Sequence, residues 1–433
     1  MKNLIRVVAG MLALTVAMEA GAQCTGDLTF DARVDGSDLG RLLSWWGPVV
    51  TSSLDSLACD LDRDGFVNGA DLGILLSNWG YCPPTAIRVS PSEWCLTGST
   101  KITITGTYLT TMRSVTIGGV PATNVTVLDQ LTVTALTPPG SLGSADVVLS
   151  GAAGTVTLPA GFRYVPIRVP AWATLVEADP DPAVVTDPAM RAAISSTCWA
   201  WRVRDTVTQT ELLLVPPGVF QMGCAMPTDA NVCQSYSLPV HQVTLTKPFY
   251  LGRYEVTQAQ WAARMGSNPS RFQASDGFPG SDDRPVERVS WTTIQSYLAA
   301  TGMRLPTEAE WEYACRAGTQ TPFYNGTTDD NTLVGLAWCG ANANNQTHPV
   351  GLKSPNALGF HDMYGNVWEW VKDWAGSYAG AIVDPTGPGT GTLRGIRGGS
   401  WFTDSYYSRS CARSSAGPNY LDFSFGFRVA RNP

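Results

Sequence analysis

The stretch LPTEAEWEYACRAG, residues 305–318, decides the fold of the C-terminal half of the chain. It is typical of a short capped helix, with Thr307 at the N-cap, Glu310 as the capping-box partner three residues later, and Gly318 as the stop. The segment SWTTIQSYLAATG, residues 290–302, also has helical spacing, but regular patterns are otherwise sparse in this half. We therefore expect a domain of few helices, short strands and long loops.

Seven motifs lie around this helix along the chain. In order they are VPPGVFQMG (215–223), YEVTQAQW (254–261), RPVERVSW (284–291), MRLPTEAEWEYACRAG (303–318), YGNVWEWVKDW (364–374), RGGSW (397–401) and GFRVAR (426–431). Together they make residues 211–433 resemble the formylglycine-generating enzyme (sulfatase-modifying factor) family. The resemblance implies a C-type-lectin-like α+β fold with little regular structure. It also implies, for the oxidases of the family, a Cu(I) site built from two thiolates.

The resemblance places the two copper cysteines at Thr403 and Ser408 of this chain. Hydroxyl groups are hard and stay protonated at neutral pH, so they are poor ligands for soft Cu(I). We therefore expect no catalytic residue at these positions and no copper. The glutamates of residues 308–312 are assigned to helix capping and the solvent-exposed face rather than to acid–base chemistry.

Three functions follow from this pattern. The first is a non-oxidase module that binds a glycan or peptide ligand in a C-terminal groove, because function belongs to the site and not to the fold. The second is a formylglycine-generating oxidase acting on a sulfatase cysteine, with a copper site rebuilt from Cys339 or Cys411. The third is a purely structural cell-surface role.

The resemblance carries two further implications. The segment HDMYGNVWEW (361–370) would hold a structural Ca²⁺ through the side chains of Asp362 and Glu369 and the carbonyl groups of Gly365 and Val367. The alternative is a tryptophan-rich core segment with a solvated Glu369. A family disulfide would join Cys315 to Cys411.

The N-terminal part contains a repeat, DLTFDARVDGSDLGRLLSWWG (27–47) and DLDRDGFVNGADLGILLSNWG (60–80). Oxygen-bearing side chains recur there at the spacing of a calcium loop, followed by a helical apolar pattern. In the second copy the expected ligands are Asp60, Asp62, Asp64, the Phe66 carbonyl, Asn68 and Asp71. In the first copy they are Asp27, Asp31, Asp35 and Asp38.

The first copy departs from the calcium pattern at Thr29 and at Ala32, which replaces the turn glycine Gly65 of the second copy. For both copies the alternative is an acidic, solvated loop. The paired loops of residues 23–83 resemble dockerin modules. This resemblance implies a small α-helical calcium-loop repeat that docks onto a cohesin-like protein.

Two segments separate the repeat from the C-terminal domain. Residues 84–166 alternate apolar and polar positions between turns, which predicts an antiparallel β-sandwich, and they resemble the immunoglobulin-like IPT/TIG domain. Residues 167–210 are rich in proline and acidic residues and are predicted to be a linker containing one short helix. The expected fold class is thus multidomain: repeat, sandwich and α+β domain.

The N-terminus has the pattern of an export signal over residues 1–22, with lipidation of Cys24 as an alternative. The ten cysteines all follow this segment, so we expect disulfides and a secreted, cell-surface or periplasmic protein. A local bond between Cys224 and Cys233 is predicted. The pairing of Cys24, Cys59, Cys82 and Cys95 stays open, as does a bond between Cys198 and Cys339.

Bulk composition excludes other classes. The 433 residues suggest two to four domains, and 44% hydrophobic with 15% charged residues indicates folded modules. The net charge is −7 and no basic run occurs, so nucleic acid is not an expected partner. Only three histidines are present and no later segment has the length and apolarity of a membrane span.

Overall fold

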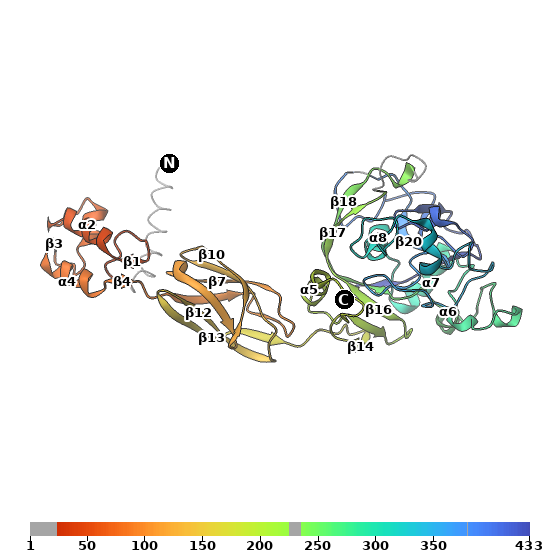
Figure 1. Cartoon of the computed structure of the whole chain (residues 1–433), viewed down its shortest axis with the longest axis horizontal. Helices are drawn as coiled ribbons and strands as arrows, with labels where there is room; N and C mark the ends of the chain where they lie inside the picture. Colours follow the sequence, from red (N-terminus) through yellow and green to blue (C-terminus); the bar gives the residue numbers. More distant parts are fainter. Residues whose placement is uncertain (1–23, 225–234, 379) are drawn as a thin grey trace. The chain divides into compact units, whose positions relative to one another are not determined.

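A computed structural model describes residues 24–224, 235–378 and 380–433. The chain divides into two compact units, one ending at Pro166 and the other beginning at Ile167 (Figure 1). The predicted export signal, residues 1–22, lies outside the described residues. Among the described residues, no helix combines the length and apolarity needed to cross a bilayer.

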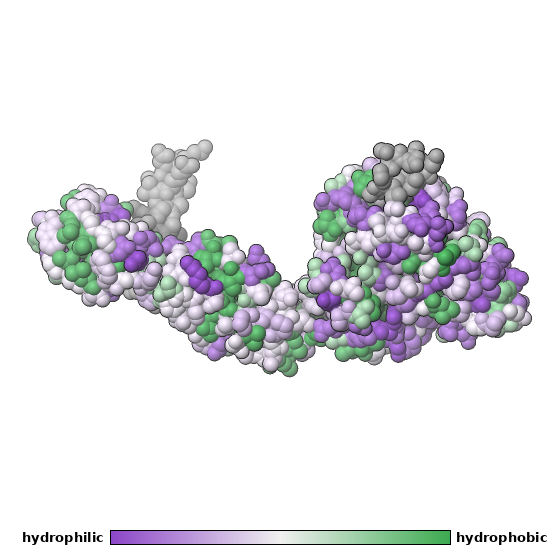
Figure 2. Space-filling view, in the orientation of Figure 1, coloured by the Kyte–Doolittle hydropathy of each residue, from purple (hydrophilic) through white to green (hydrophobic). Residues whose placement is uncertain are grey.

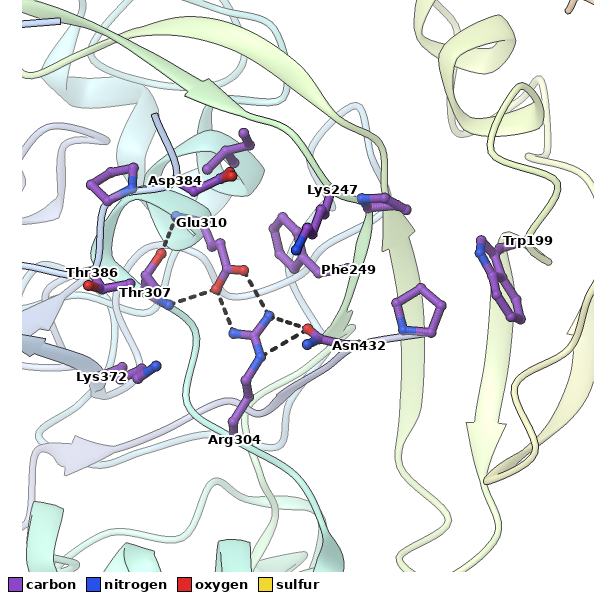
Figure 3. Close-up of a pocket in the computed structure, with 14 residues that line it drawn as sticks. Trp199, Lys247, Phe249, Arg304, Thr307, Glu310, Lys372, Asp384, Thr386 and Asn432 are labelled. Carbon is purple, nitrogen blue, oxygen red and sulfur yellow. Dashed lines mark hydrogen bonds and ion pairs between the residues drawn. The ribbon is translucent and has the colours of Figure 1, made fainter. Parts of the chain in front are cut away.

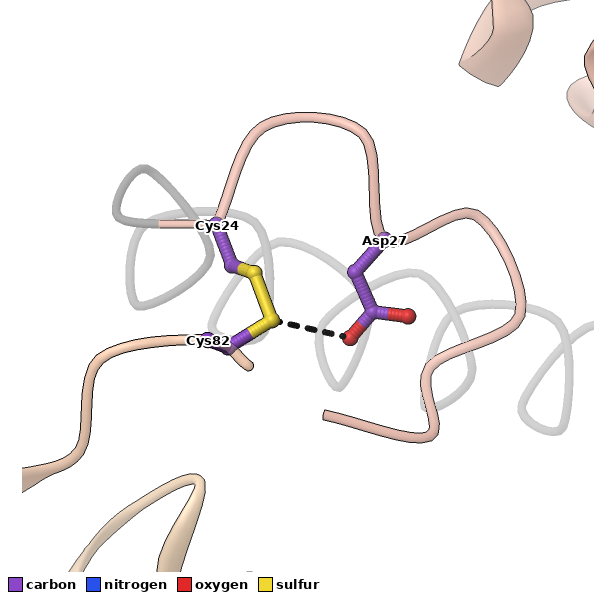
Figure 4. Close-up of side chains that lie close together, drawn as sticks. All are labelled: Cys24, Asp27 and Cys82. Atoms are coloured by element: carbon purple, nitrogen blue, oxygen red, sulfur yellow. Dashed lines mark hydrogen bonds between the residues drawn. A yellow bond between two sulfur atoms is a disulfide. The ribbon is translucent and has the colours of Figure 1, made fainter. Parts of the chain in front are cut away.

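The repeat folds into two loop–helix units with matching geometry. Its elements are β1 (Arg33–Val34), α2 (Gly36–Ser44), β2 (Gly47–Pro48), α3 (Leu54–Cys59), β3 (Phe66–Val67), α4 (Gly69–Ser77) and β4 (Gly80–Tyr81). β1 pairs with β4 and β2 pairs with β3, so the strand of each copy pairs with the end of the other copy. A disulfide between Cys24 and Cys82 joins the two ends of the segment (Figure 4). The reciprocal pairing makes the two copies one packed body.

The predicted β-sandwich is present in residues 85–165. Its strands are β5 (Thr85–Ser90), β6 (Glu93–Cys95), β7 (Lys101–Thr107), β8 (Met112–Ile117), β9 (Val120–Pro121), β10 (Thr123–Asp129), β11 (Thr132–Leu136), β12 (Gly143–Gly151) and β13 (Gly154–Val165). They form two sheets, with orders β10-β11-β7-β5 and β6-β13-β12-β8-β9. Alternate residues, among them Ile102, Ile104, Val147 and Leu149, fill the core between the sheets.

The C-terminal unit has three small sheets and few helices. The first sheet contains β14 (Ala173–Glu177), β15 (Arg202–Asp205), β16 (Glu211–Val215), β19 (Phe249–Gly252) and β25 (Ala430–Arg431). The second contains β17 (Gly218–Met222), β18 (His241–Leu245) and β21 (Ile382–Val383). The third contains β23 (Arg413–Ala416), β22 (Arg394–Arg397), β20 (Trp368–Trp374) and β24 (Phe425–Gly426).

The helices of this unit are α5 (Pro188–Ser195), α6 (Gln258–Met265), α7 (Trp291–Thr301), α8 (Glu308–Arg316) and α9 (Leu333–Leu336). The predicted cap of α8 is confirmed, since Thr307 and Glu310 form a reciprocal capping box. The helix ends one residue before the expected stop, because Ala317 itself adopts the left-handed conformation with φ of 45°.

The prediction of a linker over residues 167–210 was wrong. β14, α5 and β15 all lie in this segment, and β15 pairs with β16 inside the first sheet. Ile194, Trp201 and Val203 are buried in the core of the C-terminal unit. Proline and acidic residues made the segment resemble a linker, but its few apolar residues are enough to anchor it to the domain.

A buried ion network joins α8 to the third sheet of the C-terminal unit. Arg397 on β22 pairs with Glu312 on α8, and Arg316 donates to the same carboxylate at 2.7 and 2.9 Å. Burial alone would raise the pKa of Glu312, but the two guanidinium groups outweigh it and hold the pKa below its ordinary value. Glu308 and Glu312 are therefore buried structural residues, which corrects the expectation that they lie on an exposed face.

Replacing Arg397 should destabilise the domain strongly, because it leaves Glu312 with one cation in a dry site. We expect Arg397→Met to lower the free energy of unfolding of the C-terminal unit by about 3–5 kcal/mol. Urea unfolding followed by tryptophan fluorescence measures this change. The control is Arg271→Met, whose ion pair with Asp276 is about half exposed and should contribute less than about 1 kcal/mol. Equal losses in the two variants would contradict the structural role of Arg397.

Candidate functional site

The two positions expected to correspond to the copper cysteines, Thr403 and Ser408, lie side by side. Thr403 and Ser408 follow β22 in a loop that ends in a short 3-10 helix, residues 405–408. A Cβ atom built on Gly399 would lie 2.4 Å from the Ser408 hydroxyl oxygen and 2.8 Å from that of Thr403. The positive φ of Gly399, 74°, lets the backbone pass between the two hydroxyl groups. The loop thus brings both positions to one point.

Both hydroxyl groups are already engaged by the backbone. Thr403 Oγ1 donates to the Ser400 carbonyl at 3.0 Å and accepts from the Ser400 N–H at 2.8 Å. Ser408 Oγ donates to the Asp404 carbonyl at 3.1 Å. Among the described residues neither hydroxyl contacts a base, so the pair has neither the soft ligands for Cu(I) nor the partner that activates a nucleophile. The residues at these two positions therefore do not fit copper.

Arg397 holds the segment that follows this loop. Its guanidinium donates to the carbonyl groups of Ser410, Cys411 and Ala412 at 3.2, 3.2 and 2.6 Å. Arg397, the arginine of the RGGSW motif, thus holds this segment from the interior of the domain. Its side chain is fully buried and does not reach the surface of the loop. Sequence inspection did not identify this role, since a buried arginine has no local pattern.

An aromatic cluster lies next to the former copper positions. Trp401 packs against Phe272, Phe402 and Phe423, with ring centroids 5.2 to 5.8 Å apart. The Trp401 ring is 7% exposed, but Phe402 and Phe423 are 51% and 45% exposed. We call Phe272, Trp401, Phe402 and Phe423 the aromatic cluster. Exposed rings on a rigid base can contact sugar rings or apolar side chains.

A cavity of the C-terminal unit lies away from these positions. It has a volume of about 530 Å³ and includes neither Thr403 nor Ser408. Figure 3 shows its residues around Arg304, which holds Glu310 at 2.6 and 2.8 Å and also contacts Asn432. Glu310 is in turn the capping-box partner of Thr307. The second acid of this cavity, Asp384, accepts from the N–H and the hydroxyl of Thr246. Both acids are thus engaged in structural contacts.

The charges of Asp362 and Glu369, two of the expected calcium ligands, interact with each other, but most of their oxygens already accept hydrogen bonds. Both oxygens of Glu369 lie 2.6 Å from Arg428 nitrogens, and one also accepts from Trp311 at 2.7 Å. Glu369 is therefore buried and paired, and the alternative of a solvated Glu369 was wrong. One Asp362 oxygen accepts from the Gly351 N–H at 2.6 Å, while the other is buried without a partner among the described residues.

Acidic charge exceeds basic charge at this place. Burial raises the pKa of Asp362 to about 6, and burial with the Asp362 and Glu369 charges raises that of Glu255 well above its ordinary value. The carboxylates of Glu255, Asp362 and Glu369 all interact with the guanidinium group of Arg428. A cation would relieve this imbalance, although Glu369 would have to give up contacts with Arg428 to bind it.

The acidic residues of the repeat converge more closely. Carboxylate oxygens of Asp27, Asp31 and Asp38 lie within 4.8 Å of one another, as do those of Asp60, Asp62 and Asp71. Ala32 has a φ of 72°, close to the 92° of Gly65, so the first loop makes the same turn without a glycine. Asp35 and Asn68 instead cap α2 and α4, and Asp64 accepts from the Phe66 N–H.

A third group at this place is excluded as a metal site. Cys24 and Cys82 lie close to Asp27, and a Cys82 sulfur is 3.6 Å from an Asp27 oxygen (Figure 4). Because the two sulfurs are joined in a disulfide, they are not thiolates and cannot ligate a metal as such.

The predicted disulfide between Cys315 and Cys411 is absent, and both residues are buried free thiols. Ser410, the neighbour of Cys411, faces Cys315 in its place, and the Tyr364 hydroxyl also contacts the thiol. Burial raises the pKa of Cys315 to about 12, so it remains a neutral thiol. Cys59 and Cys339 are free as well, which excludes a bond between Cys339 and Cys198.

Cys95, Cys198 and Cys224 are disulfide-bonded. The predicted partner of Cys224 is Cys233, which lies outside the described residues.

Because of the buried Glu287 carboxyl group, we expect the stability of the C-terminal unit to depend on pH. Glu287 accepts from the Arg271 and Phe272 N–H groups at 2.6 and 2.9 Å, and burial raises its pKa from 4.5 to about 7. The folded chain keeps this proton at pH values where the unfolded chain has lost it. Stability should therefore fall as the pH rises from about 4.5 to 7, by roughly 3 kcal/mol.

Chemical denaturation of the wild type and of Glu287→Gln across this pH range measures the difference. The variant should lose this part of the slope, whereas Glu177→Gln at a partly exposed position should keep it. A variant with the wild-type slope would show that Glu287 does not cause the pH dependence.

Comparisons with known proteins agree with this architecture. Residues 202–433 match the family described as "Sulfatase-modifying factor enzyme 1-like domain", and residues 84–164 match the IPT/TIG domain. A formylglycine-generating enzyme of Streptomyces coelicolor is 32% identical over 322 residues, covering 59% of this chain and 96% of that protein. Chaperone protein LppX of Paenibacillus barcinonensis is 30% identical over 284 residues, covering 53% and 91%.

Among solved structures, PvdO from Pseudomonas aeruginosa is 30% identical, covers 54% of this chain and 98% of that chain, and has a TM-score of 0.44. The family match spans more than half of the sequence and contains all the residues of the former copper loop and its buried support. The chain therefore belongs to the family of proteins with a sulfatase-modifying factor enzyme 1-like domain.

Proposed function

We propose that the C-terminal domain is a non-oxidase binding module that recognises a glycan or peptide through the aromatic cluster. The observation that carries this proposal is the pair Thr403 and Ser408. Their hydroxyl groups stand together beside Gly399, yet both are satisfied by backbone groups and neither can hold Cu(I). The two side chains are therefore close together but do not supply copper ligands.

The surface beside this loop supports a binding role. Phe402 and Phe423 expose about half of their area on either side of the buried Trp401 ring. Phe272 supports Trp401 from below, and Glu287 fixes the Phe272 backbone. Large apolar rings that stay exposed on an ordered base mark surfaces that a ligand covers.

The absence of oxidation can be tested with a sulfatase-type Cys-x-Pro-x-Arg peptide, Cu(I) and O₂. We expect mass spectrometry to find no conversion of the peptide thiol to an aldehyde by the mature wild-type protein, beside an active formylglycine-generating enzyme as control. Detection of the aldehyde would overturn the binding-module proposal.

The same geometry predicts a gain of copper binding. Because both side chains flank Gly399, Thr403→Cys together with Ser408→Cys should bind one Cu(I), measured by competition with a chromogenic Cu(I) chelator. The control is Thr292→Cys together with Ser377→Cys, which places two thiols on separate exposed elements. Equal copper affinity of the two double variants would show that the former site no longer has a ligand geometry.

The second candidate function is a formylglycine-generating oxidase. It is favoured by the relatives that bear this name and by the position of Cys339, whose neighbour Gly340 donates its N–H to the Thr403 carbonyl at 3.0 Å. Cys339 would have to supply the soft ligand that Thr403 lacks. The peptide assay distinguishes this function from binding.

The repeat is proposed to bind Ca²⁺ as a dockerin-like module and to dock onto a cohesin-like protein. Three convergent carboxylates in each loop support the calcium part. Docking is supported by apolar side chains that remain exposed at equivalent positions of the two copies, Leu43 with Leu76 and Trp46 with Trp79. Figure 2 shows apolar residues gathered on the visible face of this segment. The chain is also proposed to be exported, in accord with its disulfides.

Calcium binding can be counted by calorimetric titration. We expect Asp71→Asn to remove one bound Ca²⁺ relative to the wild type, and Asp38→Asn with Asp71→Asn to remove two, because each aspartate belongs to one cluster. Asp55→Asn, outside both clusters, should remove none. Circular dichroism checks that α2 and α4 persist. Unchanged stoichiometry in the double variant would exclude calcium from the repeat.

A further inference from the structure

A second cavity of about 350 Å³ lies in the C-terminal unit, away from the residues of the proposed binding surface. It is formed by the start of β18, the first turn of α8, the end of β20, the segment 382–388 and Arg413 on β23. None of its residues belongs to the aromatic cluster, and neither Thr403 nor Ser408 lines it. Its volume is in the range of small-molecule sites.

The charged groups of this cavity are already paired within the protein. Arg413 donates to both oxygens of Glu308 at 2.6 and 2.7 Å. Asp384 accepts from the N–H and the hydroxyl of Thr246. A ligand would therefore find no unpaired ionic partner in these residues, and a charged group would be desolvated without compensation.

The Tyr378 hydroxyl takes no part in these ion pairs and hydrogen bonds. It is buried and has no hydrogen-bond partner among the described residues. The tyrosine ring is held in place by two neighbours, with the His241 ring centroid 4.6 Å away and the Arg413 guanidinium 4.0 Å from the ring centroid. A buried donor without an acceptor costs about 1–3 kcal/mol, so an acceptor from a ligand would be favoured.

Two further polar groups line the same cavity. Asp373 accepts from the Glu308 N–H at 2.9 Å, and burial, with the charge of Glu308, raises its pKa to about 7, so the carboxyl group can donate as well as accept near neutral pH. His241 Nδ1 lies 3.0 Å from the Pro239 carbonyl, so Nε2 is the ring nitrogen that remains for a ligand hydroxyl group. Trp374, Met222 and Pro388 supply apolar wall.

We propose that this cavity binds a neutral sugar ring, with the Tyr378 hydroxyl, Asp373 and His241 taking its hydroxyl groups and the aromatic side chains packing on its apolar face. Neutral donors and acceptors beside aromatic rings suit a polyhydroxylated ring, since each sugar hydroxyl can both donate and accept. The site is independent of the proposed binding surface at the aromatic cluster, so either can fail without the other.

The test uses the mature full chain and saturation-transfer NMR with the methyl glycosides of glucose, galactose, mannose and xylose. Sodium glucuronate is the charged probe. We expect transfer to at least one neutral glycoside, and Tyr378→Phe should weaken its affinity roughly tenfold, since one hydrogen bond is lost and the ring is kept. Tyr407→Phe, outside the cavity, is the matched control and should bind as the wild type does.

The outcomes separate the site from a structural role of the tyrosine. A hydroxyl that matters only for folding would change the thermal midpoint of Tyr378→Phe and leave the glycoside affinity as it is, which would overturn the proposal. Transfer to none of the neutral glycosides, or to glucuronate alone, would overturn it as well. Asp373→Asn is the second variant, and it should weaken the same glycoside if Tyr378→Phe does not fold.

Discussion

The buried Arg397 guanidinium is the interaction on which the C-terminal domain depends. It joins β22 to α8 through Glu312 and at the same time binds three successive carbonyl groups of residues 410–412. The fully buried Arg397 side chain thus fixes α8, β22 and the segment that follows the loop of Thr403 and Ser408. A buried cation of this kind is stable only because every charge around it is matched, and Glu312 is matched twice, by Arg397 and Arg316.

The other family motifs contribute in the same way. Arg428 of the GFR segment pairs with Glu369 of the NVWEW segment, and Arg413 pairs with Glu308 of α8. These residues form the scaffold and none of them is at the surface of the former copper loop. These ion pairs do not include Thr403 or Ser408, so the scaffold constrains the residue types at these two positions less directly. A chain 32% identical to a formylglycine-generating enzyme over the aligned part can therefore keep the scaffold while its site residues differ.

Two kinds of surface remain for ligands in this domain. The aromatic cluster is open and apolar, and it suits a ligand that covers it from outside. The smaller cavity is lined in part by the segment after β20, and the Tyr378 hydroxyl in its wall has no hydrogen-bond partner among the described residues. The N-terminal repeat adds convergent carboxylates and exposed apolar side chains that match between its two copies. Recognition is therefore proposed for separate elements of the chain.

The sequence by itself determined the features that depend on neighbouring residues. The capping box at Thr307 and Glu310, the alternating strands of the sandwich and the acidic spacing of the repeat are local patterns, and local hydrogen bonds and side-chain periodicity produce them. The motifs also indicated the family, which the match over residues 202–433 confirms, while the correspondence of Thr403 and Ser408 to copper cysteines stays a prediction.

Features that depend on residues far apart in the chain emerged only from the folded structure. The ion pair of Arg397 with Glu312 and the contact of Ser410, rather than Cys411, with Cys315 join such segments. The Tyr378 hydroxyl, which has no hydrogen-bond partner among the described residues, is likewise a result of packing. The segment 167–210 was assigned to the domain only by pairing of β15 with β16. Burial and pairing of charges are properties of three-dimensional packing, and no short stretch of sequence records them.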